Sequence, residues 1–282
     1  MRYIDSLPPL KEVISHYKLT ARKSLGQNFL LDPNVNSKIV RLAGDVTNFD
    51  VLEIGPGPGG LTRALLGQGA RKVVAVEKDL RFYDPLEQLA ECYPKRLKII
   101  KGDALKIELK RYLHPPIRIV ANLPYNIGTE FLMRLLTADE WPPFWTSLTL
   151  MFQREVAKRI TATHGSKSYS RLSIISQWRT ETKILMSLSA SSFTPRPKVD
   201  SMLVNFKSLE HPKFEANRLL LEEIVSKAFQ KRRKMLRSAL RNYLPNMENI
   251  LIKSGISPTD RAEDISLEKF CCLARNIEIM HS

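Results

Sequence analysis

Short apolar runs recur along the chain up to residue 206, and they define the elements that we predict first. The runs occupy residues 50–54, 72–77, 97–101, 117–121, 146–152, 182–188 and 202–206. Apolar runs of this length, bounded by turn residues, are typical of buried strands. Helices are predicted between them at residues 61–66, 129–136, 153–160 and 172–178. Strands that alternate with helices indicate an α/β protein whose sheet is covered on both faces.

The pattern changes beyond residue 206, where helical spacing replaces the strand-like runs. Residues 219–243 are predicted to form one long helix, with His211-Pro212 as the linker before it. Its apolar stripe, spaced as on one helical face, consists of Val225, Phe229, Leu236, Leu240 and Tyr243. We therefore predict two domains, residues 1–207, which include an N-terminal extension at 1–24, and a helical domain at 208–282.

The net charge of +15 and a pI near 9.8 point to a polyanionic partner, nucleic acid before membrane. No run is long and apolar enough to span a bilayer, and the first residues lack the order of a signal peptide. The three cysteines, Cys92, Cys271 and Cys272, form neither a metal-binding spacing nor a disulfide framework. We expect a cytoplasmic monomer that binds no metal ion.

A loop rich in glycine and proline, residues 55–60, follows the first of these strands. It formally fits the dinucleotide fingerprint G-x-G-x-x-G, but Pro56 and Pro58 lack the N–H groups that a pyrophosphate needs. Gly55 and Gly57 still permit close approach of a ligand to the backbone. With acidic Glu53 beside it, the loop favours a cationic nucleoside without phosphates, such as S-adenosylmethionine. The alternative is a tight strand-to-helix turn.

Acidic residues end the next two strands. Glu77 lies roughly twenty residues beyond the glycines, the spacing at which an acid meets ribose hydroxyls. Asp103 follows the strand at 97–101 and is placed to accept from an adenine amino group. A lone acid at a strand end is usually a cap, so each is weak evidence alone. The carboxyl ends of parallel strands share one edge of the sheet. The glycine loop, Glu77, Asp103 and Asn122, which follows the strand at 117–121, therefore together predict a cofactor site there.

The tetrapeptide Asn122-Leu123-Pro124-Tyr125 follows the strand at 117–121. Asn122 offers an acceptor beside a donor, Pro124 restricts the backbone, and Tyr125 supplies a ring on which a base can stack. The segment fits a planar amine, although an ordinary turn is an equal alternative. Phe193, in a loop stiffened by prolines, is a second candidate aromatic; it is otherwise a hydrophobic plug under that loop.

A further loop precedes the predicted helix start at Asp32-Pro33, an N-cap followed by a proline at the first helical position. Gln27 and Asn28 lie on this loop next to Gly26. From these residues alone a capped surface loop is the more common structure.

These motifs occur in an order that resembles the ribosomal RNA adenine dimethyltransferase family, most closely its bacterial small-subunit enzymes. The resemblance covers nearly the whole chain except residues 1–18. The segments that carry it are residues 25–30, 53–59, 77, 102–103, 122–125 and the Phe193-x-Pro195-x-Pro197-x-Val199-x-Ser201 pattern. It implies a Rossmann-like, seven-stranded S-adenosylmethionine-dependent methyltransferase sheet, mostly parallel with an antiparallel final strand, and a small C-terminal helical domain.

The resemblance also implies roles for particular residues. Cofactor contacts are implied at Gln27, Asn28, Leu30, Gly55, Glu77, Asp103 and Asn122. A site for the target adenine is implied at Asn122, Leu123, Pro124, Tyr125 and Phe193. The implied reaction transfers methyl groups to N6 of two adjacent adenines near the 3′ end of 16S ribosomal RNA in the small subunit or its precursor, two methyls on each.

Basic residues of the C-terminal domain form the predicted RNA-binding set. They are Lys227, Lys231, Arg232, Arg233, Lys234, Arg237 and Arg241. A run of charge is usually a solvated face, but these seven cations are expected to face no acid, which favours RNA. Arg232 points toward the apolar side of the predicted helix, so we expect it to have a partner or to reach a neighbouring domain.

Two other functions are compatible with the sequence. A large-subunit RNA dimethyltransferase of the erythromycin-resistance type would have the same sheet and tetrapeptide. A ribosome-assembly factor whose binding matters more than its catalysis belongs to a different class of protein.

Overall fold

The computed structural model describes residues 7–281, so residues 1–6 of the predicted extension lie outside the described part. Its contacts divide the chain into two compact units. The first comprises Met1–Arg134, Pro143–Ala157 and Lys183–Ser208, and the second Leu135–Pro142, Lys158–Thr182 and Leu209–Ser282. The predicted domain boundary at residue 208 coincides with one of the points at which the chain crosses from the first unit to the second. The functions of the two domains stay predictions.

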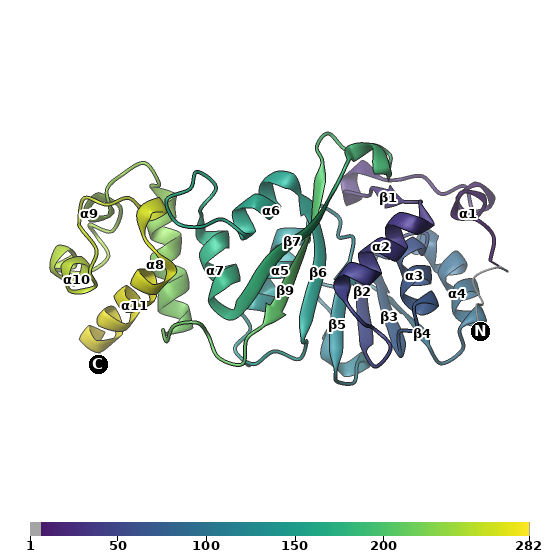
Figure 1. Ribbon diagram of the computed structural model, residues 1–282, viewed down its shortest axis with the longest axis horizontal. Helices are drawn as coiled ribbons and strands as arrows, with labels where there is room; N and C mark the ends of the chain where they lie inside the picture. Colours follow the sequence, from purple (N-terminus) through teal and green to yellow (C-terminus); the bar gives the residue numbers. More distant parts are fainter. Residues whose placement is uncertain (1–6, 282) are drawn as a thin grey trace. The chain divides into compact units, whose positions relative to one another are not determined.

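The first unit is built on a seven-stranded sheet with the strand order β4-β3-β2-β5-β6-β9-β7 (Figure 1). The strands are β2 (Asp50–Ile54), β3 (Lys72–Glu77), β4 (Leu97–Lys101), β5 (Ile117–Ala121), β6 (Ser147–Gln153), β7 (Thr180–Leu188) and β9 (Ser201–Ser208). Strands β2 to β6 pair in parallel, whereas β9 pairs with β6 antiparallel. The predicted α/β class, the seven strands and the antiparallel final strand are confirmed.

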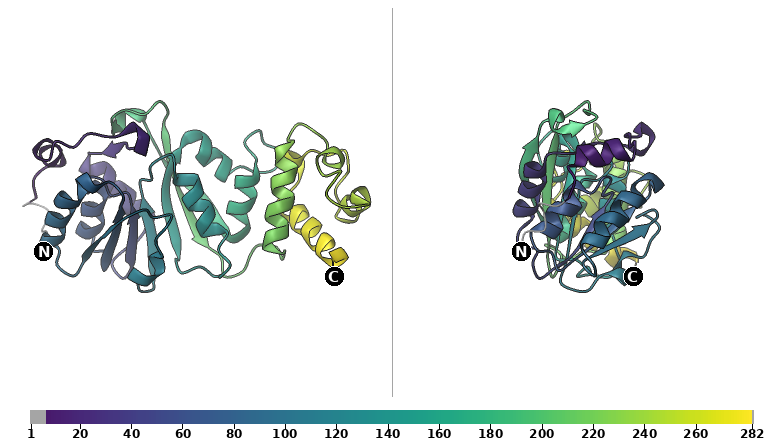
Figure 2. Two further views of the ribbon diagram at one scale, coloured as in Figure 1. Left: turned by 180° about the vertical axis from the view of Figure 1, so that it is seen from behind. Right: turned by 90° about the vertical axis from the view of Figure 1, so that its right-hand side faces the viewer.

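The central strands are largely buried because helices cover the sheet. All residues of β2 are buried. Helices α2 (Pro33–Ala43), α3 (Gly60–Gly67) and α4 (Tyr83–Cys92) contribute Ile39, Leu65 and Leu89 to one apolar cluster with Val51 and Val73 of the sheet. Figure 1 shows these helices on one face of the sheet. Helix α5 (Gly128–Leu136) can be followed in Figure 2, where the molecule is viewed from behind. Parallel strands require such crossover helices.

The strand order reverses at β2, and this reversal positions the site. From β2 the chain proceeds through β3 to β4 on one side, while β5 pairs with β2 on the other side. At such a switch point the loops leaving neighbouring strands diverge and open a crevice beyond their carboxyl ends. The loop after β2, the end of β3 and the tetrapeptide after β5 therefore meet there.

A small antiparallel pair, which the sequence did not predict, joins the N-terminal segment to a distant loop. Strand β1 (Phe29–Leu30) pairs with β8 (Phe193–Thr194), with Leu30 opposite Phe193. Asp32 caps α2 by accepting from the N–H of Asn34 at 2.8 Å, which confirms the predicted helix start. The remaining elements of the first unit are α1 (Leu10–His16), η2 (Lys23–Leu25), η3 (Leu80–Phe82), η4 (Leu109–Tyr112) and η5 (Ala190–Ser192).

The second unit packs helices around its own core. They are α7 (Arg171–Arg179), α8 (Arg218–Gln230), α9 (Leu236–Ala239), α10 (Met247–Lys253), η6 (Ala262–Asp264) and α11 (Leu267–His281). Trp178, Leu221, Leu251 and Phe270 are buried in one cluster of this unit. Helix α6 (Arg154–Ile160) begins in the first unit and ends in the second.

The prediction of one helix over residues 219–243 is wrong. Helix α8 ends at Gln230, and Lys231 adopts a non-helical conformation with φ −114° and ψ 46°. The N–H groups of Leu236 and Arg237 donate instead to the carbonyls of Asp260 at 2.8 Å and Pro258 at 3.0 Å. These hydrogen bonds to a distant segment replace helical ones. In a continuous helix the like charges of Lys231 and Lys234, three positions apart, would also repel each other.

Within residues 7–281, no helix combines the length and apolar character needed to cross a membrane. In the same part of the chain, no group of three or more His, Cys, Asp or Glu side chains is arranged to hold a metal ion.

Candidate active site

A cavity of about 620 Å³, counting its open mouth, lies at the carboxyl ends of the central strands. This size suits a small-molecule ligand. It is lined by most of the predicted site residues, namely Gln27, Asn28, Leu30, Glu53, Gly55, Gly57, Glu77, Asn122, Leu123, Pro124 and Tyr125. A neighbouring cavity shares Gln27, Gly55, Glu77 and Pro124 with it and adds Asp103. The structure thus gathers in one place residues that lie far apart in the sequence.

The loop after β2 lies directly against the tetrapeptide. Gly55 has φ +67°, and a Cβ atom at this position would lie 3.3 Å from the Pro124 ring. Glycine is therefore required both for the backbone conformation and for the close approach. The N–H of Gly57 is used by Glu77, and Pro56 and Pro58 have none. The loop consequently offers few donors to an anionic ligand.

Glu77 is held in place by backbone N–H groups. Its Oε1 accepts from Lys78 at 2.9 Å and Asp79 at 2.8 Å, and its Oε2 accepts from Gly57 at 3.1 Å. Burial raises the pKa of this carboxyl, and the three hydrogen bonds oppose the rise. A carboxylate oxygen can accept more than one hydrogen bond, so Oε2 retains acceptor capacity toward a ligand hydroxyl.

Glu53 is a second, more deeply buried acid, with 1% of its surface exposed. Its Oε2 accepts from the hydroxyl of Thr62 at 2.7 Å. Burial raises the pKa of Glu53 to about 8, and the charge of Glu77 contributes to the rise. Two poorly solvated acids disfavour an anion in this cavity and favour a ligand that carries positive charge.

Asp103 borders the neighbouring cavity and is paired with a surface lysine. Its Oδ2 lies 2.9 Å from Nζ of Lys78, a side chain that is 63% exposed, and its Oδ1 accepts from the N–H of Leu105 at 3.0 Å. The hydrogen bond from Lys78 lowers the pKa of Asp103. An ion pair this exposed contributes little stability, so a ligand donor can replace the lysine.

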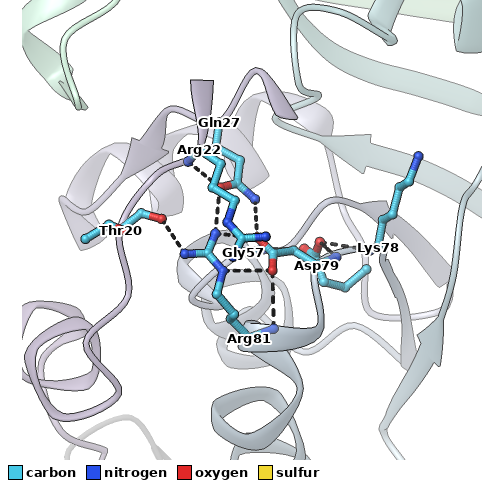
Figure 3. A network of polar contacts seen from close by, with 8 residues as sticks. Thr20, Arg22, Gln27, Gly57, Lys78, Asp79 and Arg81 are labelled. Carbon is cyan, nitrogen blue, oxygen red and sulfur yellow. Dashed lines mark hydrogen bonds and ion pairs between the residues drawn. The ribbon is translucent and has the colours of Figure 1, made fainter. Parts of the chain in front are cut away.

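Gln27 uses its side-chain amide within the protein. Its Nε2 donates to Asp79 Oδ2 at 2.9 Å, and its Oε1 accepts from the N–H of Arg22 at 2.9 Å (Figure 3). Asp79 is in turn paired with Arg81. Asp79 and Arg81 were not among the site residues predicted from the sequence. The available signal was an acid two residues beyond Glu77, at the start of η3, where it reads as an ordinary helix cap.

The tetrapeptide after β5 is fixed by contacts on both sides. Nδ2 of Asn122 donates to the backbone carbonyl of Asn28 at 3.1 Å, which leaves Oδ1 as the acceptor available to a ligand. Leu123 is buried, with 2% of its surface exposed. The Tyr125 hydroxyl lies 2.5 Å from Oγ of Ser201, and burial raises the pKa of Tyr125. Ser201, the last residue of the proline-rich pattern, thus orients the Tyr125 ring.

Phe193 is the predicted site residue that lines neither cavity. It is 3% exposed and lies in the apolar cluster of the first unit, opposite Leu30 in the β1–β8 pair. Its position here is that of a hydrophobic plug, and its role in stacking on a base stays a prediction.

The basic segment of the second unit forms a surface groove lined by Lys231, Arg232, Arg233 and Lys234. The expectation that all seven predicted cations face no acid is wrong at two positions. Lys227 lies 3.6 Å from Glu223 on the preceding helical turn. Arg232 lies 2.7 Å from Glu263 and also donates to a backbone carbonyl, so its expected partner is confirmed. Among the described residues no acidic partner faces Lys231, Arg233, Lys234, Arg237 or Arg241.

Two solved structures are similar to this chain over most of its length. A dimethyladenosine transferase from Plasmodium falciparum aligns with a TM-score of 0.71 and 26% identity over 89% of this chain and 97% of that one. The 23S rRNA methyltransferase ErmE aligns with a TM-score of 0.68 and 25% identity over 89% of this chain and 100% of that one.

Curated relatives are similar over nearly their whole length. Ribosomal RNA small subunit methyltransferase A of Ruegeria sp. (strain TM1040) is 58% identical over 278 residues, 99% of each chain. The protein of the same name from Paracoccus denitrificans (strain Pd 1222) is 56% identical over 277 residues, 98% of each chain. The family model described as ribosomal RNA adenine dimethylase matches residues 18–278. With this match across both units, the chain belongs to the ribosomal RNA adenine dimethylase family.

Proposed function

We propose that the protein transfers methyl groups from S-adenosylmethionine to N6 of two adjacent adenines near the 3′ end of 16S ribosomal RNA. Each adenine is dimethylated during biogenesis of the small ribosomal subunit. The observation that carries the proposal is the orientation of Asn122, whose amide oxygen is left as an acceptor at the wall of the cavity. Family membership supplies the reaction class, ribosomal RNA adenine dimethylation.

The names of the relatives support the small subunit as the substrate. Proteins named for the small subunit are 56–58% identical to this chain over at least 98% of its length. The 23S rRNA methyltransferase ErmE has the same fold at 25% identity. The small subunit is therefore the better supported of the two RNA substrates.

The residues around the cavity fit S-adenosylmethionine, which supplies an electrophilic methyl group on a sulfonium cation. Glu77 would accept from the ribose hydroxyls, and Asp103 from the adenine amino group. Glu53 provides a buried acid that favours a cationic ligand, and the phosphate-free cofactor needs no donors from Pro56 or Pro58. Backbone and side chains of Gln27, Asn28, Leu30, Gly55 and Gly57 would form the walls around it.

The tetrapeptide would orient the target amine. The lone pair of the adenine N6 is delocalised into the ring, so it must be turned out of conjugation before it can attack. Oδ1 of Asn122 and the carbonyl of Leu123 would accept hydrogen bonds from the two N–H groups of the amine. The carbonyl of Pro124 is less suitable, because it already accepts from the N–H groups of Ile127 and Gly128. Tyr125 would stack on the extruded base, as bases are commonly held in such pockets, with Phe193 proposed on its other face. Attack of N6 on the methyl carbon would break the methyl–sulfur bond, release S-adenosylhomocysteine and pass one N6 proton to solvent. Such a displacement depends on positioning more than on a strong base.

The second unit would supply the contacts to ribosomal RNA. Its exposed and unpaired cations Lys231, Arg233 and Lys234 lie in one groove, with Arg237 and Arg241 nearby in the sequence. Lys227 and Arg232 already have acidic partners and would contribute less. A monomeric state and a cytoplasmic location are part of the same proposal, since the substrate is a ribosomal particle.

The proposal is tested with isolated ribosomal subunits from a strain that lacks this methylation. Small subunits incubated with the protein and methyl-labelled S-adenosylmethionine should incorporate label, and mass spectrometry should find two adjacent dimethyladenosines near the 3′ end of 16S RNA. Large subunits in the same buffer should remain unlabelled. Label in 23S RNA instead would favour the erythromycin-resistance type of activity.

A further inference from the structure

We infer that Asp79 and Arg81 are positioning residues whose ion pair fixes residues 20–28 as a wall shared by the cofactor cavity and the tetrapeptide. The identity of the ligand in this inference rests on the proposed function. Neither residue belongs to the motifs by which the family was recognised.

The ion pair between Arg81 and Asp79 is bidentate and largely shielded from solvent. Nε of Arg81 lies 3.0 Å from Asp79 Oδ1, and Nη2 lies 2.5 Å from Oδ2. The Asp79 side chain is 2% exposed and that of Arg81 26% exposed. Hydrogen bonds from Arg81 lower the pKa of Asp79 to about 2, so the carboxylate stays ionised at neutral pH. Paired contacts of this kind restrict orientation more strongly than a single one.

Both members of the pair also hold the N-terminal segment (Figure 3). Nη1 of Arg81 donates to the carbonyl of Thr20 at 2.9 Å. Oδ2 of Asp79 accepts from the side chain of Gln27 at 2.9 Å, and Gln27 in turn accepts from the N–H of Arg22. The ion pair therefore binds residues 20–28 near both ends, at Thr20 and at Gln27.

Residues 20–28 also contact the tetrapeptide at residues 122–125, through Gly26 and Asn28. The carbonyl of Asn28 accepts from Asn122 at 3.1 Å, which sets the orientation of the amide proposed to hold the adenine. A Cβ atom on Gly26 would lie 3.4 Å from the backbone nitrogen of Tyr125, so the two backbones are closely packed there. A displacement of residues 22–28 would thus move the partner of Asn122.

The same pair reaches the cofactor cavity through the loop after β3. The N–H of Asp79 donates to Oε1 of Glu77 at 2.8 Å, and Glu77 lines both cavities. Loss of the pair would therefore loosen the proposed ribose acceptor and the wall formed by Gln27 and Asn28 together. A purely structural role, capping of η3 by Asp79, would instead affect stability without a specific effect at the site.

The chain offers a matched ion pair at the opposite end of the strands. Arg71 lies 2.8 Å from Asp50, whose side chain is also 2% exposed, at the first residue of β2. Arg71 also donates to a backbone carbonyl, that of Pro115, as Arg81 does to Thr20. Arg71→Met and Arg81→Met should each leave a buried aspartate without its arginine, but only Arg81→Met removes contacts to the site.

Calorimetric titration with S-adenosylmethionine compares wild type, Arg71→Met, Arg81→Met and Arg81→Lys, each at a temperature where circular dichroism shows it folded. We expect Arg81→Met to raise Kd about tenfold or more, because Glu77 and the wall formed by Gln27 and Asn28 would no longer be held in place. A loss of this size is comparable to that of one hydrogen bond to a charged group. Arg71→Met should stay near the wild-type Kd. Lysine keeps the charge but cannot make the bidentate contact. The Kd of Arg81→Lys should therefore be closer to that of Arg81→Met than to that of wild type.

Two further measurements separate positioning from stability. Single-turnover methylation at saturating cofactor should fall about tenfold or more in Arg81→Met, because displacement of a reacting group by about 1 Å can cost on the order of 10²-fold. Amide hydrogen exchange in residues 22–28 should accelerate in Arg81→Met and not in Arg71→Met. If both variants lose stability but match wild type in Kd, rate and exchange of this segment, the inference is overturned. A wild-type protein that binds no S-adenosylmethionine would count against the proposed function, and the exchange comparison would still decide the positioning role.

Discussion

The side-chain nitrogen of Asn122 donates to the backbone carbonyl of Asn28 across 3.1 Å. A carbonyl oxygen accepts and never donates, so the contact requires that Nδ2 of Asn122 points toward Asn28 and that Oδ1 points away from it. Oδ1 is then the end left for a substrate, at the end of β5 and beside the loop that follows β2. The residue most directly implicated in holding the target amine is thus oriented by a segment about ninety residues away in sequence.

Replacement of Asn122 by alanine should abolish or greatly reduce methyl transfer while leaving the fold intact. Alanine removes the acceptor for the adenine amine but removes no apolar core volume. Loss of a preorganised polar group at a reacting centre typically costs on the order of 10²–10³ in rate. Single-turnover methylation of small subunits at saturating cofactor measures the effect, with Asn34→Ala, an exposed residue of α2, as the matched control.

A wild-type rate in Asn122→Ala would reduce Asn122 to a turn residue and remove the basis of the proposed mechanism. The same variant bears on the assembly-factor alternative. If it transfers no methyl groups but still restores small-subunit maturation in a deletion strain, binding has a role beyond catalysis.

Glu77→Gln should weaken binding of S-adenosylmethionine. The amide group keeps the size of the side chain but places an NH₂ where a carboxylate oxygen now accepts from Gly57 or would accept from the ribose. A hydrogen bond to a charged acceptor contributes about 1.5–3 kcal/mol, so Kd should rise by roughly tenfold to a hundredfold. Calorimetric titration measures Kd directly, and an unchanged value in a folded variant would contradict the assignment.

Replacement of Lys231, Arg233 and Lys234 by glutamine should weaken binding to the small subunit and flatten its salt dependence. Each phosphate contact releases condensed counterions, so loss of three contacts should reduce the slope of log affinity against log salt by about 2–3. A triple replacement of the exposed residues Lys11, Lys38 and Arg41 is the charge-matched control. If both triples change the slope equally, the groove in the second unit is not a specific RNA contact.

The parts of the fold that were predictable from sequence are those with local causes. The strands at 50–54, 72–77, 97–101 and 117–121 have the predicted bounds because each is an apolar run with a turn signal at its end. The acids and the tetrapeptide at those ends meet because parallel strands share one carboxyl edge. Most of the cavity could therefore be assembled from the sequence and the resemblance.

The parts that were not predictable depend on contacts between distant segments. The break after Gln230 is maintained by hydrogen bonds from residues 236 and 237 to the segment around Asp260. The pairing of β1 with β8 encloses Phe193, which the sequence placed at the edge of the site. Asp79 and Arg81 could not be connected with the site from the sequence, because their partners, Thr20 and Gln27, are more than fifty positions away. None of these contacts leaves a periodic or compositional signal.

Glu53→Gln should change the pH dependence of stability in the protein without cofactor. Burial raises the pKa of Glu53 from 4.5 to about 8, so between these values the folded state holds a proton that the unfolded state has lost. The contribution of Glu53 to stability should therefore fall as pH rises from about 4.5 to 8, at up to about 1.4 kcal/mol per pH unit. Below this window the carboxyl makes no difference, because it is protonated in both states.

Glutamine does not titrate, so the stability of Glu53→Gln relative to wild type should increase through this window and level off above about pH 8. Urea unfolding at intervals from pH 4 to pH 9 measures the difference, with the exposed Glu91→Gln as a control that should run parallel to wild type. Parallel curves for Glu53→Gln and wild type would mean that Glu53 is already ionised in the empty cavity. S-adenosylmethionine carries positive charge and should favour ionised Glu53, so saturating cofactor should flatten the wild-type curve. That second comparison connects the buried acid to the cationic ligand proposed for this cavity.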